Sequence, residues 1–395
     1  MKYSDLEEEW TELWNRLIDY IKTSVKQRDN ITLSSEYWSE LSSNPNLTID
    51  VIEKNREKPW DWVEISKLPN ITFSIVEKHP DIPWEWDAGL LANPNITPDF
   101  IMDNLHLPWG NNFLKLIENP NLTMDFVERY PDLTNWNNDC CTELGNHKNI
   151  TLDILEKYRF TYNLFNRSEN PNLTLEYVFD KHHEFSDREY PGWTPDPPET
   201  LLNDWDWNEI WLGVKIKSLE EFELYTTTRS RFGYARWGGW GLSGNKNLPW
   251  EIVDKYSDKP WDWKELSQNP SITWGNILSH PDKPWDYKWI FANPNVTWEI
   301  IKNNEKLLYD VIIGDGESIS CNIGITPEIV LGYPEISWDW ELIASNSMEL
   351  GKKKWIRERR LRHIKAFQIQ RHWRNCGCNP QFKLAQRCLL RLHGD

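Results

Sequence analysis

Apolar and polar positions follow one another in short blocks along most of the chain, and each block has the length of a helix of about two turns. Thr48 is predicted to be a helix N-cap, and Leu47 and Ile52 fit a hydrophobic staple around it. This helix ends before Pro59, since a residue that precedes proline disfavours helical backbone. The turn at 59–62 (Pro-Trp-Asp-Trp) then opens a second short helix.

Two further features fit a unit of two helices. The segment at 44–46 (Asn-Pro-Asn) is predicted to close the second helix, because asparagine tolerates a left-handed cap and proline stops the helix. Acids favour the second helical position, where the helix dipole stabilises them. They are Asp50, Asp99, Asp125, Asp153, Glu176, Glu299 and Glu328. Pro98 and Pro327 take the first helical position, which suits proline.

The unit recurs through most of the chain. Asn-Pro-Asn-(Ile/Leu)-Thr stands at 44–48, 93–97, 119–123 and 170–174, with near-copies at 68–72, 147–151, 269–273, 293–297 and 322–326. A Trp follows 12 residues after the threonine position in six copies, those at Thr48, Thr72, Thr97, Pro249, Thr273 and Thr326. An aromatic residue usually comes two residues after that Trp. The tryptophans assigned to the core on this offset are Trp60, Trp62, Trp84, Trp86, Trp109, Trp261, Trp263, Trp285, Trp338 and Trp340.

Helices this short do not persist alone, so the units must be stabilised by stacking on one another. We therefore predict an all-α solenoid of about twelve two-helix repeats of ~24 residues. The alternative role for these tryptophans is an aromatic ladder that binds a ligand. Their constant offset within the repeat favours packing in the core instead. The predicted domains are an N-terminal capping helix at 1–30, the repeat solenoid at 31–350 with an irregular insertion at about 181–245, and a basic helical tail at 351–395.

The capping helix is expected over residues 4–22, with Ser4 and Glu7 as a capping box. Its apolar face consists of Leu6, Trp10, Leu13, Trp14, Leu17 and Ile21.

Composition supports a folded repeat array: the 395 residues include 26 Trp and 24 Pro. Charge is uneven along the chain, whose net charge is −17. Residues 352–395 hold 13 Lys/Arg and two acids, a net charge of +11, so the rest of the chain carries −28. An acidic body repels phosphate, so we do not expect it to bind nucleic acid. No secretory signal or membrane span is visible, so we expect an intracellular protein that is neither secreted nor in a membrane.

The Asn-Pro-Asn-Ile-Thr and Pro-Trp-Asp-Trp unit resembles the Trp-rich repeats of uncharacterised proteins of giant DNA viruses of the mimivirus kind, over most of 31–350. The ending at 369–390 is similar to one common in those proteins. The period also resembles the leucine-rich repeat variant, a superhelix of short helices, although Trp here replaces most Leu. The resemblance implies a viral protein located in the host cytoplasm or the virion. Neither family implies catalytic residues.

A glycine-rich and aromatic segment at 225–245 interrupts the acidic body. Insertions in repeat proteins gather on one face and often bind partners, although drift in a tolerant loop is the alternative. The residues assigned to binding here are Arg229, Arg231, Arg236, Trp237 and Trp240.

The basic tail is the second candidate for interaction, and 352–374 has helical spacing. Three hypotheses stand: docking onto the acidic solenoid, binding an acidic partner such as calmodulin, and binding nucleic acid. The assigned residues are Lys353, Arg357, Arg360, Ile369, Gln370 and Arg374. Ile369-Gln370-x3-Arg374 matches the first half of a calmodulin-binding IQ motif, but Asn379 stands where its second basic residue belongs.

No catalytic residue, cofactor or metal is predicted. A zinc site at His372, Cys376, Cys378, Cys388 and His393 fits by residue type only, because the usual Cys-x2-Cys spacing is missing. The sequence therefore predicts a non-catalytic repeat scaffold or adaptor with a protein partner that it does not identify. The alternative is a nucleic-acid-binding repeat protein that uses the basic tail and the 229–236 loop.

Overall fold

The computed structural model is mainly helical. It describes residues 3–29, 33–110, 113–130, 133, 144–154, 170–186, 207–228, 237–239, 241–314 and 316–375. In these ranges the extended backbone pairs only at one isolated bridge, between Thr174 and Lys215, and no strand forms. The predicted all-α class is thereby confirmed. The chain divides into two compact units, one of residues 1–34, 48–54 and 297–395, the other of 35–47 and 55–296.

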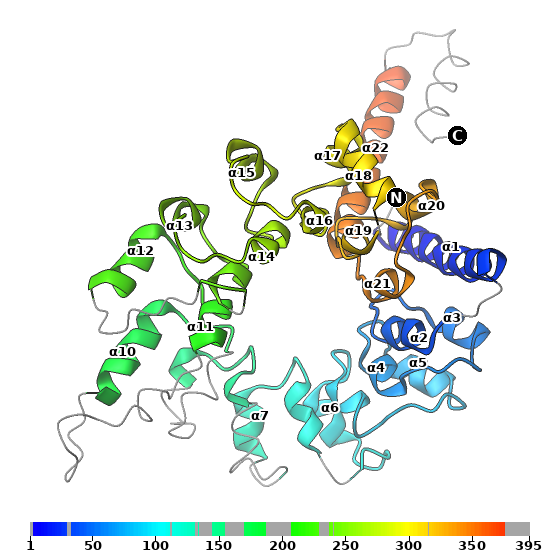
Figure 1. Ribbon diagram of the computed structural model, residues 1–395. Coiled ribbons are helices and arrows are strands. Elements are labelled where there is room, and N and C mark those ends of the chain that lie inside the picture. The colour runs from blue at the N-terminus through cyan, green and yellow to red at the C-terminus, as the bar shows by residue number, and fades with distance from the viewer. Residues whose placement is uncertain are drawn as a thin grey trace. The chain divides into compact units, whose positions relative to one another are not determined.

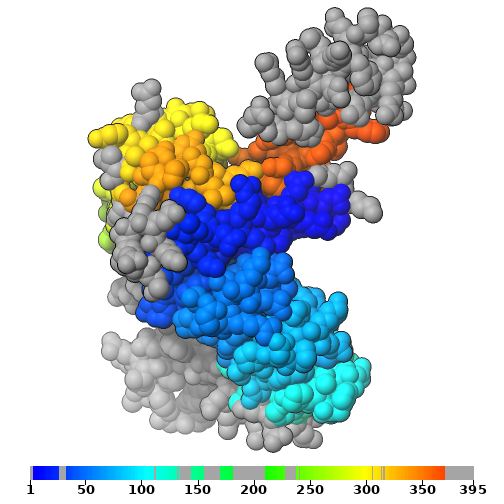
Figure 2. Space-filling model, turned by 90° about the vertical axis from the view of Figure 1, so that its right-hand side faces the viewer, coloured from blue at the N-terminus to red at the C-terminus, as the bar shows by residue number. Residues whose placement is uncertain are grey.

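The first unit brings the N-terminal helix together with the C-terminal elements. Its described helices are α1 (Tyr3–Asp29), α3 (Ile49–Lys54), α17 (Trp298–Lys302), α18 (Glu305–Ile313), α19 (Glu317–Ser320), α20 (Pro327–Gly332), α21 (Trp340–Ser345) and α22 (Glu349–Asn375). Helix α1 packs against α20 and α22, two elements that begin about 300 residues after it ends (Figure 1). Figure 2 shows α1 in blue beside the orange-red of α22.

Helix α1 buries the face that its spacing predicts. Leu6, Trp10, Leu13, Trp14, Leu17 and Ile21 are all buried. The predicted capping box is wrong, because the helix already includes Tyr3, so that Ser4 lies inside its first turn. The Ser4 hydroxyl donates to the carboxylate of the adjacent Asp5 instead. The helix also continues to Asp29, about two turns beyond the predicted end at residue 22.

The second unit holds the remaining described elements, half of them six residues long. They are α2 (Ser35–Ser42), α4 (Trp62–Lys67), α5 (Phe73–Lys78), η1 (Leu90–Ala92), α6 (Pro98–Asp103), η2 (Phe113–Glu118), α7 (Met124–Arg129), α10 (Leu175–Ser186), α11 (Trp207–Gly213), α12 (Leu219–Glu223), η4 (Leu224–Thr228), η5 (Leu242–Gly244), α13 (Trp250–Lys255), α14 (Trp263–Gln268), α15 (Trp274–Ser279) and α16 (Tyr287–Ile290).

The first Trp of each pair is a fixed part of its own repeat. Trp60 is buried, and its Nε1 donates to the carbonyl of Asn55, five residues earlier, at 2.8 Å. The same bond recurs at Trp84, Trp109, Trp261, Trp285 and Trp338, all of them buried. The indole therefore packs in the core while its N–H satisfies a carbonyl at the end of the first helix. The second aromatic residue is half-buried at Trp62, Trp86, Trp263 and Trp340.

In most copies, the first asparagine of the Asn-Pro-Asn segment or of its near-copy joins one repeat to the repeat before it. Asn93 is fully buried, and its Nδ2 donates to the carbonyls of Ser66, Leu68 and Ile71 at 2.7, 3.1 and 3.1 Å. Its Oδ1 accepts from the amide of Asn95 at 2.7 Å. Equivalent bonds to the preceding repeat occur at Asn119, Asn170, Asn245, Asn269, Asn293 and Asn346.

These asparagines do not serve as left-handed helix caps, so that sequence interpretation is wrong. Asn93 has a φ of −71°, and Met348 is the one non-glycine residue with positive φ in the described part of the chain. The extended backbone turns the amide towards the neighbouring repeat, where it donates to carbonyls at the end of the second helix and in the turn that follows it.

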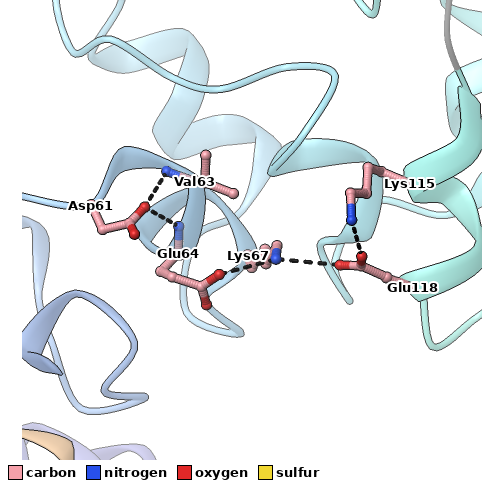
Figure 3. Close-up of polar contacts among 6 residues, drawn as sticks. All are labelled: Asp61, Val63, Glu64, Lys67, Lys115 and Glu118. Atoms are coloured by element: carbon pink, nitrogen blue, oxygen red, sulfur yellow. Dashed lines mark hydrogen bonds and ion pairs between the residues drawn. The ribbon is translucent and has the colours of Figure 1, made fainter. Parts of the chain in front are cut away.

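Serine and aspartate side chains make a second set of links. The buried Ser66 hydroxyl accepts the amide of Glu85, and the serines at 42, 243, 267 and 320 accept the amide 19 residues ahead in the same way. Asp61 caps α4 by accepting the amides of Val63 and Glu64 at 3.0 and 3.1 Å (Figure 3). Asp262, Asp286 and Asp339 cap their helices likewise.

The predicted threonine caps are present at most but not all copies. Thr97, Thr123, Thr273 and Thr326 accept a first-turn amide. Thr72 and Thr297 make no such bond. Pro98 and Pro327 start α6 and α20 as predicted, and Ser218 takes the threonine role in the irregular unit by capping α12.

Candidate interaction surface on helix α22

Helix α22 begins at a tight contact with the preceding repeat. The Gly351 amide donates to the carbonyl of Ile323 at 3.0 Å. A Cβ built on Gly351 would lie 2.0 Å from the carbonyl oxygen of Ile325, so only glycine allows the helix to approach this closely. Glu349 lies in the first turn and pairs with Lys353 one turn later. The start of the helix is therefore fixed by the backbone of the repeat.

The first half of α22 is anchored by aromatic packing. Trp355 and Ile356 are buried, and the Trp355 ring meets the Trp10 ring edge to face at 5.5 Å. The guanidinium of Arg359 lies 4.3 Å from the centre of the Trp355 ring. Cation–π stacking of this kind contributes about 0.5–2 kcal/mol. The anchor thus combines apolar burial with a stacked charge.

Ion pairs surround that anchor. Arg359 pairs with Glu9 of α1 at 2.8 Å and with Glu328 of α20 at 2.9 Å. Lys352 pairs with Glu7 at 2.6 Å, and Lys354 pairs with Glu299 at 2.6 Å. Burial raises the pKa of Glu299, but the bond and charge of Lys354, together with bonds from the backbone and from Thr297, outweigh it and hold that pKa below its usual range. Glu299 and Glu328 both stand at the second helical position of a repeat, so the basic helix contacts the row of acids that the sequence predicts.

The second half of α22 is exposed and carries large apolar side chains. Leu361, Ile364 and Phe367 are 47%, 44% and 65% exposed. Exposed basic residues accompany them at Arg357, Arg360, Arg362 and Lys365. Leu361, Ile364 and Phe367 are not among the tail residues assigned to interaction from the sequence. Their recurrence every three residues among basic residues could have indicated them.

The assigned tail residues fall into three groups. Lys353, Arg357 and Arg360 are exposed, and Ile369 is 41% exposed. Gln370 and Arg374 lie within α22, but their side chains are outside the described part. His372 belongs to the same stretch of helix, and Cys376, Cys378, Cys388 and His393 lie outside the described residues. In the part of the chain that is described, no group of three or more His, Cys, Asp or Glu could hold a metal.

A small cavity of about 230 Å³ lies beside the anchored half of α22, between α17 and α20. Its lining includes Trp298, Tyr333 and Trp355 together with the carboxylate of Glu299. That carboxylate is already bonded to Lys354, which also lines the cavity. The cavity is therefore part of the contact between α22 and the repeats.

The central segment contributes one described residue to the assigned binding set. Trp237 is half-buried and packs edge to face against Phe222 and Trp261, at 6.0 and 5.0 Å. This geometry is that of a packing residue. Arg229, Arg231, Arg236 and Trp240 lie outside the described residues, so the hypothesis that they bind a partner stays a prediction.

Comparison with known proteins gives no match to a family model, to a curated protein or to a solved structure. A search of the described helices finds none that is long and apolar enough to cross a membrane.

Proposed function

We propose that this protein is a non-catalytic repeat scaffold that binds other proteins. The observation that carries the proposal is the line of buried asparagines, each donating to the repeat before it. Side chains that join consecutive copies in one direction are what a stacked solenoid of about twelve ~24-residue repeats requires. Solenoids present extended surfaces, and binding is the use to which such surfaces are put.

Helix α22 completes the scaffold in this proposal. Its first half docks within the first unit through Trp355 and Arg359, which is the intramolecular docking that the charge asymmetry favours. Its second half is left free for a partner, since Leu361, Ile364 and Phe367 are exposed. The resemblance of the repeat and of the chain's ending to giant-virus proteins supports an intracellular role, in the host cytoplasm or the virion.

Cross-linking in the cells that make the protein tests this function. A tagged full-length chain is cross-linked through lysine, treated with nuclease, purified and analysed by mass spectrometry, with an untagged chain as control. We expect cross-links from exposed lysines, Lys353 and Lys365 among them, to one or a few specific proteins. Recovery of no protein above the control would contradict the proposal. Loss of the recovered material on nuclease treatment would favour nucleic-acid binding instead.

A further inference from the structure

We propose that the second half of α22 is a docking helix for an acidic protein with an apolar groove of the EF-hand type. This inference rests on the proposed function and names the class of partner. In helix-in-groove recognition, an amphipathic helix lays apolar side chains into a hydrophobic groove while its charges meet the rim. The exposed side chains of α22 supply both parts of that arrangement.

The geometry of the helix separates an occupied side from a free one. At about 100° per residue, Trp355, Ile356 and Arg359 fall within an arc of roughly 100°, and all three take part in the anchor. Leu361 and Ile364 lie on the remaining arc, and Phe367 follows a turn later and is the most exposed of the three. Leu361 and Phe367 are about 9 Å apart along the axis, the length over which a groove holds two anchors.

Charge on this half of the helix selects an acidic partner. Arg357, Arg360, Arg362 and Lys365 are exposed, whereas Glu358 is the one acid in that stretch and already pairs with Arg362 at 3.8 Å. Because three large apolar side chains stand among these cations, a partner must offer an apolar surface as well as carboxylates. Duplex nucleic acid supplies charge without such a groove.

An anionic membrane is a poorer fit than a protein groove. A membrane-bound helix needs a long continuous apolar face, whereas the exposed side chains from Leu361 to Phe367 cover only about two turns. The body of the chain, with its charge of −28 implied by the sequence, would also be repelled by the negative lipid surface.

The sequence that follows strengthens the choice of partner. Ile369-Gln370-x3-Arg374 continues in the same helix and matches the first half of an IQ motif, with Asn379 in place of the second basic residue. EF-hand sensors such as calmodulin present a methionine-rich apolar groove, the type of surface that repacks around different helices. Anchoring of the first half also lowers the entropic cost of binding, because the helix is already formed.

Binding of the full-length chain to calmodulin tests this inference. Fluorescently labelled calmodulin, with and without Ca²⁺, is titrated with the chain at physiological salt. We expect a dissociation constant of about 10 μM or tighter in at least one of the two states. The double variant Leu361→Glu/Phe367→Glu should weaken binding at least tenfold. Leu278→Glu, at a position on α15 that is 61% exposed, is the matched control and should leave it unchanged.

Three outcomes would overturn the inference: no binding to calmodulin in either state, binding that the double variant does not weaken, and stronger binding to phosphatidylserine vesicles or duplex DNA than to calmodulin. Circular dichroism of each variant verifies that the fold is intact, which we expect because both substituted side chains are exposed. Failure here with specific cross-linked proteins still recovered from cells would refute the EF-hand partner while leaving the scaffold function in place.

Discussion

Replacement of Asn93 by alanine tests the link between consecutive repeats. The side chain is fully buried, and its amide donates to three carbonyls of the preceding repeat while its oxygen accepts one amide of its own. Alanine removes all four bonds and leaves the carbonyls of Ser66, Leu68 and Ile71 without this donor. The Ile71 carbonyl keeps a bond from the Asn95 side chain at 3.1 Å, and the Leu68 carbonyl keeps one from the Ile71 amide at 3.0 Å.

The magnitude follows from those four bonds. A typical intramolecular hydrogen bond contributes about 0.5–1.5 kcal/mol net, and a buried group left without its partner loses more. We therefore expect Asn93→Ala to lower the free energy of unfolding by about 3 kcal/mol. Asn93→Asp should be worse, because it places a carboxylate against three carbonyl oxygens in a buried position.

Urea unfolding followed by tryptophan fluorescence measures the loss. The matched control is Asn247→Ala, at the second asparagine of an equivalent segment, where the side chain is exposed. The control should stay within about 0.5 kcal/mol of the parent chain. If Asn93→Ala and the control lose the same small amount, the asparagines do not join the repeats and the reasoning is refuted.

Three further predictions use the same urea assay. Trp109→Phe keeps most of the buried ring but loses the 2.8 Å bond to a carbonyl, so it should cost about 1–2 kcal/mol, and no loss would contradict the capping role of the indole. Burial raises the pKa of Glu118, but bonds from Lys115 and Lys67 outweigh it and lower that pKa (Figure 3). The stability that Glu118 contributes is therefore present at neutral pH and lost as the pH falls. Glu118→Gln should flatten the decline in the free energy of unfolding between about pH 5 and pH 3. An unchanged pH profile in this variant would count against the prediction. Trp355→Ala should cost about 3–5 kcal/mol by removing the anchor of α22, whereas a cost below about 1 kcal/mol would show that the helix is not held there.

The sequence predicted the secondary structure of the repeat better than its connections. The position and burial of Trp60 followed from a constant offset, since packing repeats wherever the unit repeats. The role of Asn93 did not, because a local pattern shows a possible cap but not a carbonyl some 25 residues earlier in the chain. Ser66 was missed for the same reason, although a serine at a constant distance of 19 residues before the residue whose amide donates to it was visible.

The candidate surface was predictable in part. Clustered basic residues indicated that 352–374 would interact with acids, and Glu328 was already placed at the second position of a helix. Which half of the helix would be buried could not be read from spacing, because both halves carry apolar residues between arginines. Burial of Trp355 against Trp10 depends on α1 and α22 meeting from opposite ends of the sequence, which no local pattern reveals.

Hydrogen exchange of the native chain tests most directly whether the repeats stack as one array. The amides of Asn95, Asn121 and Asn295 each donate to a buried asparagine oxygen, so they should exchange slowly and with the period of the repeat. In Asn93→Ala we expect protection to fall at 68–72 and 93–97 while it persists at 293–297. Fast exchange at all these amides in the parent chain, or an equal loss at every repeat in the variant, would contradict an array held together by links between neighbours.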